Sequence, residues 1–101
     1  MAGRIEERLS ELGIMLPDAP TPSANYVPFR RSGNQVFIAG QVSITSDEGI
    51  TGKVGGDLSV DDGYAAARLC GLNILAQLRT ALGDDIDRAR AVKLGGFVNA
   101  P

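Results

Sequence analysis

The chain has 101 residues, of which 44% are hydrophobic and 22% charged, so it can bury the core of one small domain but has no room for two. Its net charge of −2 provides no basic face for strong binding to nucleic acid or to an anionic membrane. The absence of His excludes imidazole zinc sites and Ser–His or Cys–His triads within this chain.

The signals for compartment all point to the cytoplasm. The single cysteine, Cys70, cannot form an intramolecular disulfide, which fits a reducing environment. Residues 4–8 are mostly charged and lack the apolar core of a signal peptide. No apolar run approaches the roughly 18 residues of a membrane span. We therefore expect a cytoplasmic protein with no membrane partner.

The first predicted element is a short helix over residues 4–12. Ile5, Leu9 and Leu12 fall on one face at helical spacing. Residues 16–23 follow as an extended surface connector, because three prolines in eight residues forbid both a helix and a central strand.

Residues 26–41 carry the pattern of a β-hairpin. Gly33 and Asn34 supply the turn, since both residue types tolerate the positive φ that tight hairpin turns require. The second strand ends at Gly40, where backbone or a ligand can approach closely. A further short strand is predicted over residues 50–54, before a Gly-Gly break.

The strongest helix signal covers residues 59–82. Ser59 and Asp62 form a capping-box pattern at its start, and Gly83 is a stop signal at its end. The main apolar face is predicted to hold Tyr64, Ala67, Cys70, Ile74, Leu78 and Leu82. A narrower second stripe holds Ala65, Leu69, Leu72 and Ala76, separated from the first in part by Asn73 and Gln77.

After a polar linker over residues 84–88, weak alternation predicts a strand over residues 89–98. The resulting order is helix, hairpin, short strand, long helix and strand, which is an α+β pattern. One long helix cannot cover all the apolar surface of such a sheet, so we expect a further covering segment or another subunit.

Few side chains are candidates for chemistry. Cys70 lies mid-helix and is interpreted as a buried structural thiol. The glycine-rich residues 52–57 lack the spacing of a phosphate-binding loop, and the acidic residues 84–87 lack that of a calcium loop. Arg30 and Arg31 alternate across the first strand, so only one can point inward. An exposed arginine is the ordinary interpretation, and an arginine that binds a carboxylate is the alternative. The residues thus give no signal for a phosphate-binding loop or a calcium loop.

Three features together resemble one known family. Tyr26, the Gly33-Asn34 turn and the strand ending at Ala39-Gly40-Gln41 are similar to the Rid family of reactive-intermediate deaminases, also called YjgF-type or L-PSP endoribonuclease-like proteins. The helix segment around Asn73-Ile74-Leu75 and the strand over 89–98 fit the same pattern. The resemblance implies a chorismate-mutase-like α+β fold that assembles as a homotrimer, with ligand sites between subunits. It divides the chain into an N-terminal helix and connector (1–22) and a Rid-type domain (23–101).

The resemblance also implies an activity. Well-studied members hydrolyse enamines or imines such as 2-aminoacrylate to the keto acid and ammonia, with no cofactor or metal. Tyr26 would be a pocket wall and Gly40 a backbone contact to a small carboxylate or imine ligand. Val27 stands where the family has a hydroxyl residue. The family's carboxylate-binding Arg and acidic residue are expected beyond Pro101, so the chain corresponds to the N-terminal two-thirds of the domain and its catalytic residues stay unknown.

Two other functions stay open. The chain can be a non-catalytic protein that binds small carboxylates in the same clefts. It can also be an endoribonuclease-like protein, although the acidic balance and the absence of His argue against RNA cleavage, which favours a basic groove and an acid–base pair.

Overall fold

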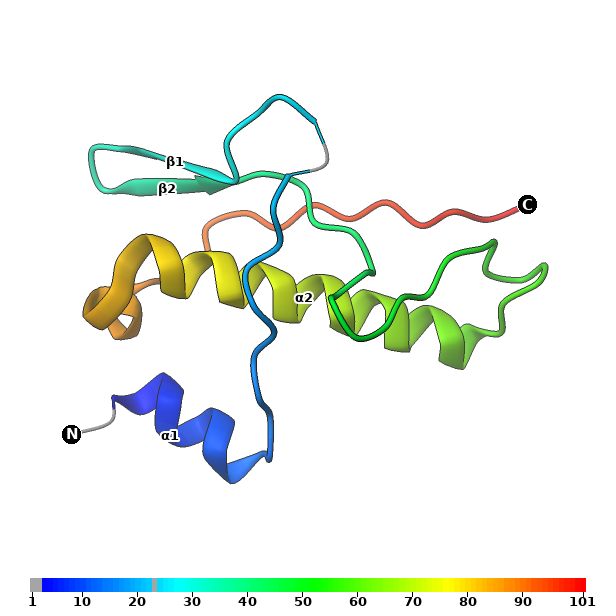
Figure 1. Ribbon diagram of the computed structural model, residues 1–101, viewed down its shortest axis with the longest axis horizontal. Coiled ribbons are helices and arrows are strands. Elements are labelled where there is room, and N and C mark those ends of the chain that lie inside the picture. Colours follow the sequence, from blue (N-terminus) through cyan, green and yellow to red (C-terminus); the bar gives the residue numbers. More distant parts are fainter. Residues whose placement is uncertain (1–2, 23) are drawn as a thin grey trace.

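The computed structural model describes residues 3–22 and 24–101 and is organised around one long helix. The elements in chain order are α1 (Arg4–Glu11), β1 (Phe29–Ser32), β2 (Gln35–Ile38), α2 (Val60–Leu82) and the 3₁₀ helix η1 (Gly83–Arg88). The β1–β2 hairpin lies on one side of α2 and α1 on the other, and the connector between them crosses α2 (Figure 1). The predicted boundary after residue 22 adjoins Ser23, which lies outside the described residues, so this division stays a prediction.

The predicted long helix is confirmed, with its cap. The Ser59 side chain accepts a hydrogen bond from the Asp62 N–H at 3.1 Å, and the Asp62 carboxylate accepts one from the Ser59 N–H at 2.9 Å. These reciprocal bonds satisfy backbone donors that have no partner within the helix. At the other end Gly83 adopts a φ of +54°, which an L side chain rarely tolerates, and α2 stops there.

The cap gives α2 a pH-dependent stability. Hydrogen bonds from the Ser59 backbone and then from its side chain hold the pKa of Asp62 below its ordinary value of 3.8. A depressed folded-state pKa means that the stabilisation is complete above pH 3.8 and is lost as the pH falls through the folded-state pKa. We therefore expect the stability advantage of the wild type over Asp62→Asn, measured by urea unfolding, to shrink below pH 3.8. An advantage that persists at low pH would contradict the cap as its cause.

The predicted hairpin is confirmed over a shorter span. β1 and β2 are antiparallel, with Phe29 opposite Ile38 and Ser32 opposite Gln35. At the turn only Gly33 has a positive φ, of +58°, and this pattern matches a type II′ turn. A bond from the Ala39 N–H to the Pro28 carbonyl at 2.9 Å extends the pairing by one step. The hairpin therefore ends immediately before Gly40.

The predicted strand over residues 50–54 is wrong. This segment is a loop in which Val54 makes only an isolated bridge to Leu58. The Ser43 hydroxyl donates to the Ile50 carbonyl, and Gly52 adopts a φ of +146°, outside the range of a regular strand. The Ile50 N–H also donates to the Ser43 carbonyl at 2.9 Å, so isolated bonds and a glycine bend replace the expected ladder.

The predicted strand over residues 89–98 is also wrong. This segment leaves η1 and returns along α2 as an exposed extended chain, with no ladder partner among the described residues (Figure 1). It is held at its far end, where the Asn99 carbonyl accepts from the Val54 N–H and the Asn99 amide donates to the Gly52 carbonyl, both at 2.9 Å. A strand requires a neighbour, and alternation along the sequence does not supply one.

The inward face of α2 differs from the predicted main apolar face. Its buried residues are Leu69, Asn73, Ala76 and Gln77. Tyr64, assigned to the main face, is 72% exposed. The narrower apolar stripe and the two amides therefore face inward, because the segments covering α2 are loops whose backbone carbonyls need donors. The other buried apolar side chains are Leu9, Leu16 and Ile86.

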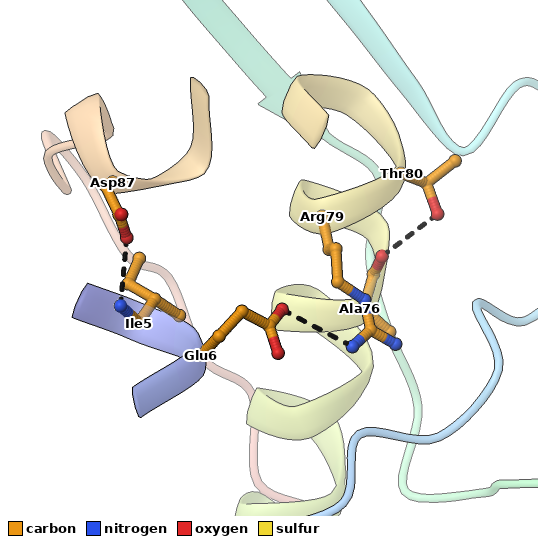
Figure 2. Close-up of polar contacts among 6 residues, drawn as sticks. All are labelled: Ile5, Glu6, Ala76, Arg79, Thr80 and Asp87. Carbon is orange, nitrogen blue, oxygen red and sulfur yellow. Dashed lines mark hydrogen bonds and ion pairs between the residues drawn. The ribbon is translucent and has the colours of Figure 1, made fainter. Parts of the chain in front are cut away.

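The predicted N-terminal helix is confirmed, and it is attached to η1. The Asp87 carboxylate in η1 accepts hydrogen bonds from the Arg4 and Ile5 N–H groups, both at 2.9 Å. The Arg4 side chain also donates to the Asp87 carbonyl. Glu6 forms an ion pair with Arg79 of α2 at 3.7 Å (Figure 2). A residue distant in sequence thus fills the N-cap role for α1, whose own N-cap residue is a glycine.

Replacing Asp87 by Ala should weaken the attachment of α1 to η1. The change removes the acceptor for two first-turn amides, and losing a helix cap typically costs about 1 kcal/mol, with a range of roughly 0.5–2 kcal/mol. We expect a destabilisation of this size in urea unfolding, together with faster proteolysis within the connector. Asp85→Ala is the matched control, because Asp85 lies in the same 3₁₀ helix but its partner is the exposed Arg88. Equal effects of the two variants would contradict the capping role.

Candidate functional site

The two residues predicted to bind ligand, Tyr26 and Gly40, line the same pocket. It has a volume of about 80 Å³ and lies where the connector, the exit of β2 and α2 meet. The remaining lining residues are Pro20, Thr21, Pro22, Pro28, Gln41, Val42, Asn73 and Gln77. Tyr26 is 47% exposed, so its ring forms an accessible edge of the pocket.

The local sequence explains how this pocket forms. Prolines at positions 20, 22 and 28 keep the chain extended and leave their own nitrogens without a donor. The Tyr26 N–H bonds to the Ala24 carbonyl at 2.9 Å, which turns the chain before β1. Where the chain leaves β2, Gly40 follows the last hairpin bond, and the Gln41 side chain donates to the Ala39 carbonyl at 3.0 Å. An added Cβ at Gly40 would meet no heavy atom within 4 Å.

Two buried amide side chains of α2 contribute to the lining. The Asn73 amide nitrogen donates to the Val42 and Ile44 carbonyls, at 3.0 and 2.9 Å. The Gln77 amide nitrogen donates to the Pro20 carbonyl at 2.8 Å. Both residues are essentially inaccessible, at 0% and 1% exposure, and the Asn73 Oδ1 has no hydrogen-bond partner in the described structure. Together they connect α2 to both loops that form the pocket.

No charged side chain lines this pocket among the described residues. Arg30 and Arg31 are both exposed on β1, opposite Phe37 and Val36, and neither reaches the pocket. The suggestion that one of them points inward to bind a carboxylate is therefore not supported by their placement. The pocket offers a tyrosine ring and hydroxyl, amides and backbone.

The other candidate side chains lie elsewhere. Cys70 is half-buried, and desolvation raises the pKa of its thiol, which keeps it protonated and weakly nucleophilic near neutral pH. In the acidic segment, Asp87 serves as the cap of α1. Within residues 3–22 and 24–101, no group of three or more His, Cys, Asp or Glu side chains is placed to hold a metal ion.

The sequence reasoning missed the roles of Asn73 and Gln77. It assigned them to the polar boundary between two apolar stripes. One signal was present: two amides stand four residues apart, at i and i+4, within the mostly apolar second half of a long helix. Short amide-bearing side chains in such a setting commonly satisfy backbone groups of a covering loop.

The scan against family models matches residues 6–100 to the family described as YjgF/chorismate mutase-like, putative endoribonuclease. The chain belongs to this family. The YjgF/chorismate mutase-like fold predicted from the resemblance is thereby confirmed, and solved structures agree with it. A putative endoribonuclease from Shewanella oneidensis is 38% identical with a TM-score of 0.72, over 77% of this chain and 52% of that one. Protein Atu1372 of Agrobacterium tumefaciens, of unknown function, is 46% identical with a TM-score of 0.72, over 87% and 54%.

A curated relative is Protein TCP17 of Trypanosoma cruzi, which is 45% identical over 98% of this chain and 62% of its own length. The chain thus spans about half the length of the two solved structures and under two thirds of this relative. Within the part of this YjgF-type chain that the structure describes, no helix combines the length and apolar character that crossing a membrane requires.

Proposed function

We propose that this chain forms one wall of the substrate pocket of a cytoplasmic, cofactor-free deaminase that hydrolyses small enamines or imines to 2-keto acids and ammonia. The observation that carries the proposal is that Tyr26 and Gly40, which precede β1 and follow β2 at the open end of the hairpin, line one pocket. Both positions correspond to the pocket wall and backbone contact that the family resemblance implies.

The size of the pocket favours a small substrate. Its volume of about 80 Å³ compares with roughly 30 Å³ per molecule of liquid water and with about 300–1,000 Å³ for typical pockets for drug-sized ligands. A branched or linear acid of a few heavy atoms suits this space. The apolar prolines and the tyrosine ring suit its short carbon chain.

The chemistry requires little from this wall. An imine carbon is already electrophilic, so a positioned water can add to it, and the resulting carbinolamine expels ammonia to leave the ketone. The wall's contribution is to hold the substrate in place and to limit the access of bulk water. The groups that bind the carboxylate and orient the water are, in this proposal, contributed by other parts of the assembled protein, since no charged side chain among the described residues lines the pocket.

The surface supports assembly into a homotrimer, which is part of the same proposal. The accessible area is 7781 Å², whereas scaling predicts about 5,500 Å² for a folded monomer of 10.6 kDa. Large apolar side chains are exposed on the segment 89–98, with Phe97 fully exposed and Val92 at 87%. Exposed apolar side chains of this kind favour a covering surface, which the proposal assigns to other subunits. Light scattering of the natural-length protein should give a trimer, and a clean monomer would argue against a site between subunits.

The deaminase proposal is tested by coupling the protein to an enzyme that produces an imine. A pyridoxal-phosphate-dependent threonine dehydratase generates 2-iminobutyrate, which hydrolyses slowly by itself. Adding the natural-length protein should accelerate 2-ketobutyrate release well beyond the rate in buffer, and heat-denatured protein should not. No acceleration would overturn the proposal. Binding of 2-ketobutyrate without acceleration would instead indicate a non-catalytic carboxylate-binding protein.

RNA cleavage is the second candidate, because the matched family and the Shewanella oneidensis relative are both described as putative endoribonucleases. The net charge of −2 and the absence of His in this chain count against it, since nucleases need a cationic groove and an acid–base pair. Incubation with single-stranded RNA distinguishes the two functions. If the protein cleaves the RNA and the Tyr26→Ala variant does not, a nuclease function would replace the deaminase proposal.

A further inference from the structure

We propose that Asn73 and Gln77 are positioning residues that shape the Tyr26–Gly40 pocket by holding two of its walls, the connector at Pro20 and the chain that follows Gly40, from a single helix. The inference rests on the proposed function for the identity of the ligand. The structural claim, that each of the two amides holds a different wall, does not rest on the proposed function.

The geometry gives each amide its own wall. Gln77 donates to the Pro20 carbonyl, 57 residues away in sequence, and so holds the connector that leads to Tyr26. Asn73 donates to the Val42 and Ile44 carbonyls, 31 and 29 residues away, and so holds the chain that leaves Gly40. The two amides are four residues apart on α2, which places them on neighbouring turns of one face. The two loops have no regular structure of their own, and their bonds to one rigid helix fix their positions relative to that helix.

The orientation of the Asn73 amide is fixed. Both N–H donors of its NH₂ group are used by two carbonyl oxygens, so exchanging nitrogen and oxygen would place an acceptor against two acceptors. The Oδ1 is left buried without a partner, which lowers stability. A side chain serving only to fill the core would carry no such cost. Both N–H groups of the Asn73 amide therefore act on the loop after Gly40, while its oxygen stays without a partner.

The chain offers a matched control on the same helix. Leu69 is buried, at 5% exposure, and does not line the pocket. Asn73→Leu and Gln77→Leu keep approximate side-chain size but remove the donors, whereas Leu69→Val disturbs the core and leaves the donors intact. The variants are compared in the natural-length protein by titration with 2-ketobutyrate and, without ligand, by hydrogen–deuterium exchange.

We expect N73L and Q77L each to raise the Kd for 2-ketobutyrate about tenfold, and L69V to change it less than twofold. Without ligand, N73L should accelerate amide exchange over residues 41–45, and Q77L over residues 18–22, each in its own wall only. L69V should not selectively accelerate amide exchange in either of these two segments. If the three variants weaken binding in proportion to their loss of stability, or if exchange rises equally in both walls, the inference is wrong.

The two readouts separate this inference from the proposed function. If the wild type does not bind 2-ketobutyrate, the proposed function fails, while the wall-specific exchange pattern still decides whether the amides act as positioning residues. If N73L does not fold, Q77L alone decides, because it removes a single hydrogen bond: selective exchange in residues 18–22 supports the inference, and its absence overturns it.

Discussion

Replacing Gly40 by Ala is expected to weaken binding of 2-ketobutyrate about tenfold and slow the coupled deamination, while leaving stability unchanged. The expected loss corresponds to about 1.4 kcal/mol of binding free energy. Gly40 has no positive φ, and an added Cβ would meet no heavy atom within 4 Å, so the fold accepts the change without strain. Because Gly40 lines the pocket, the methyl group occupies space that a ligand would use.

Gly71→Ala is the matched control for this prediction. Gly71 also has open space around its Cβ position, but it lies within α2 and does not line the pocket. Alanine should stabilise the helix there by about 0.5–1 kcal/mol and leave the Kd unchanged. Isothermal titration and urea unfolding measure both quantities for both variants. Wild-type affinity in Gly40→Ala would show that no ligand approaches this backbone.

Replacing Asn73 by Asp should produce the largest loss of stability of any prediction made for this chain. The change puts a carboxylate oxygen where the amide nitrogen now donates to two carbonyls, at 3.0 and 2.9 Å, in a fully buried position. An unpaired buried charge and two abandoned carbonyls together are expected to cost at least about 3 kcal/mol. This is a large share of the roughly 5–15 kcal/mol that holds a typical domain together.

Asn25→Asp is the control for the same chemical change, because Asn25 is exposed ahead of the hairpin. A surface substitution of this kind should change the free energy of unfolding by less than about 0.5 kcal/mol. Urea unfolding at pH 7 compares the two variants. The introduced carboxyl in N73D is disfavoured in its charged form, so the destabilisation should lessen as the pH is lowered and the group protonates. Equal losses in the two variants would mean that the Asn73 bonds contribute little.

Elements with strong local signals could be predicted from the sequence. The start of α2 follows from Ser59 and Asp62, which satisfy the first amides of the helix whatever packs against it. The hairpin turn follows from Gly33, whose backbone adopts the conformation that the turn requires. In both cases the deciding interactions lie within four residues along the chain.

Features that depend on distant partners could not be predicted. Residues 89–98 alternate as a strand should, yet the described chain provides no neighbour for them, so they remain extended and exposed. The inward face of α2 was misassigned because apolar periodicity alone cannot show that loops with unsatisfied carbonyls cover the helix. The Asn73 amide donates to two of these carbonyls, although apolar periodicity places Asn73 on the polar boundary of the helix.

The residues of the candidate site also differ in whether the sequence predicts their roles. Tyr26 and Gly40 were predicted because they belong to a recognisable family pattern, and the structure brings them to one pocket. Asn73 lies in a helix segment that fits the family pattern, but the sequence does not predict that Asn73 and Gln77 hold loops, since their partners are main-chain carbonyls whose positions depend on the whole fold. Backbone acceptors have no sequence signature.

The attachment of α1 through Asp87 has a consequence for the order of folding. A helix of eight residues is too short to persist alone in water, and here its first amides find acceptors more than 80 residues away. Closing so long a loop costs entropy that a few exposed hydrogen bonds repay only once α2 and η1 are in place. We therefore expect α1 to form last and to open first, so protection of its amides from hydrogen exchange would report that the rest of the chain has already folded.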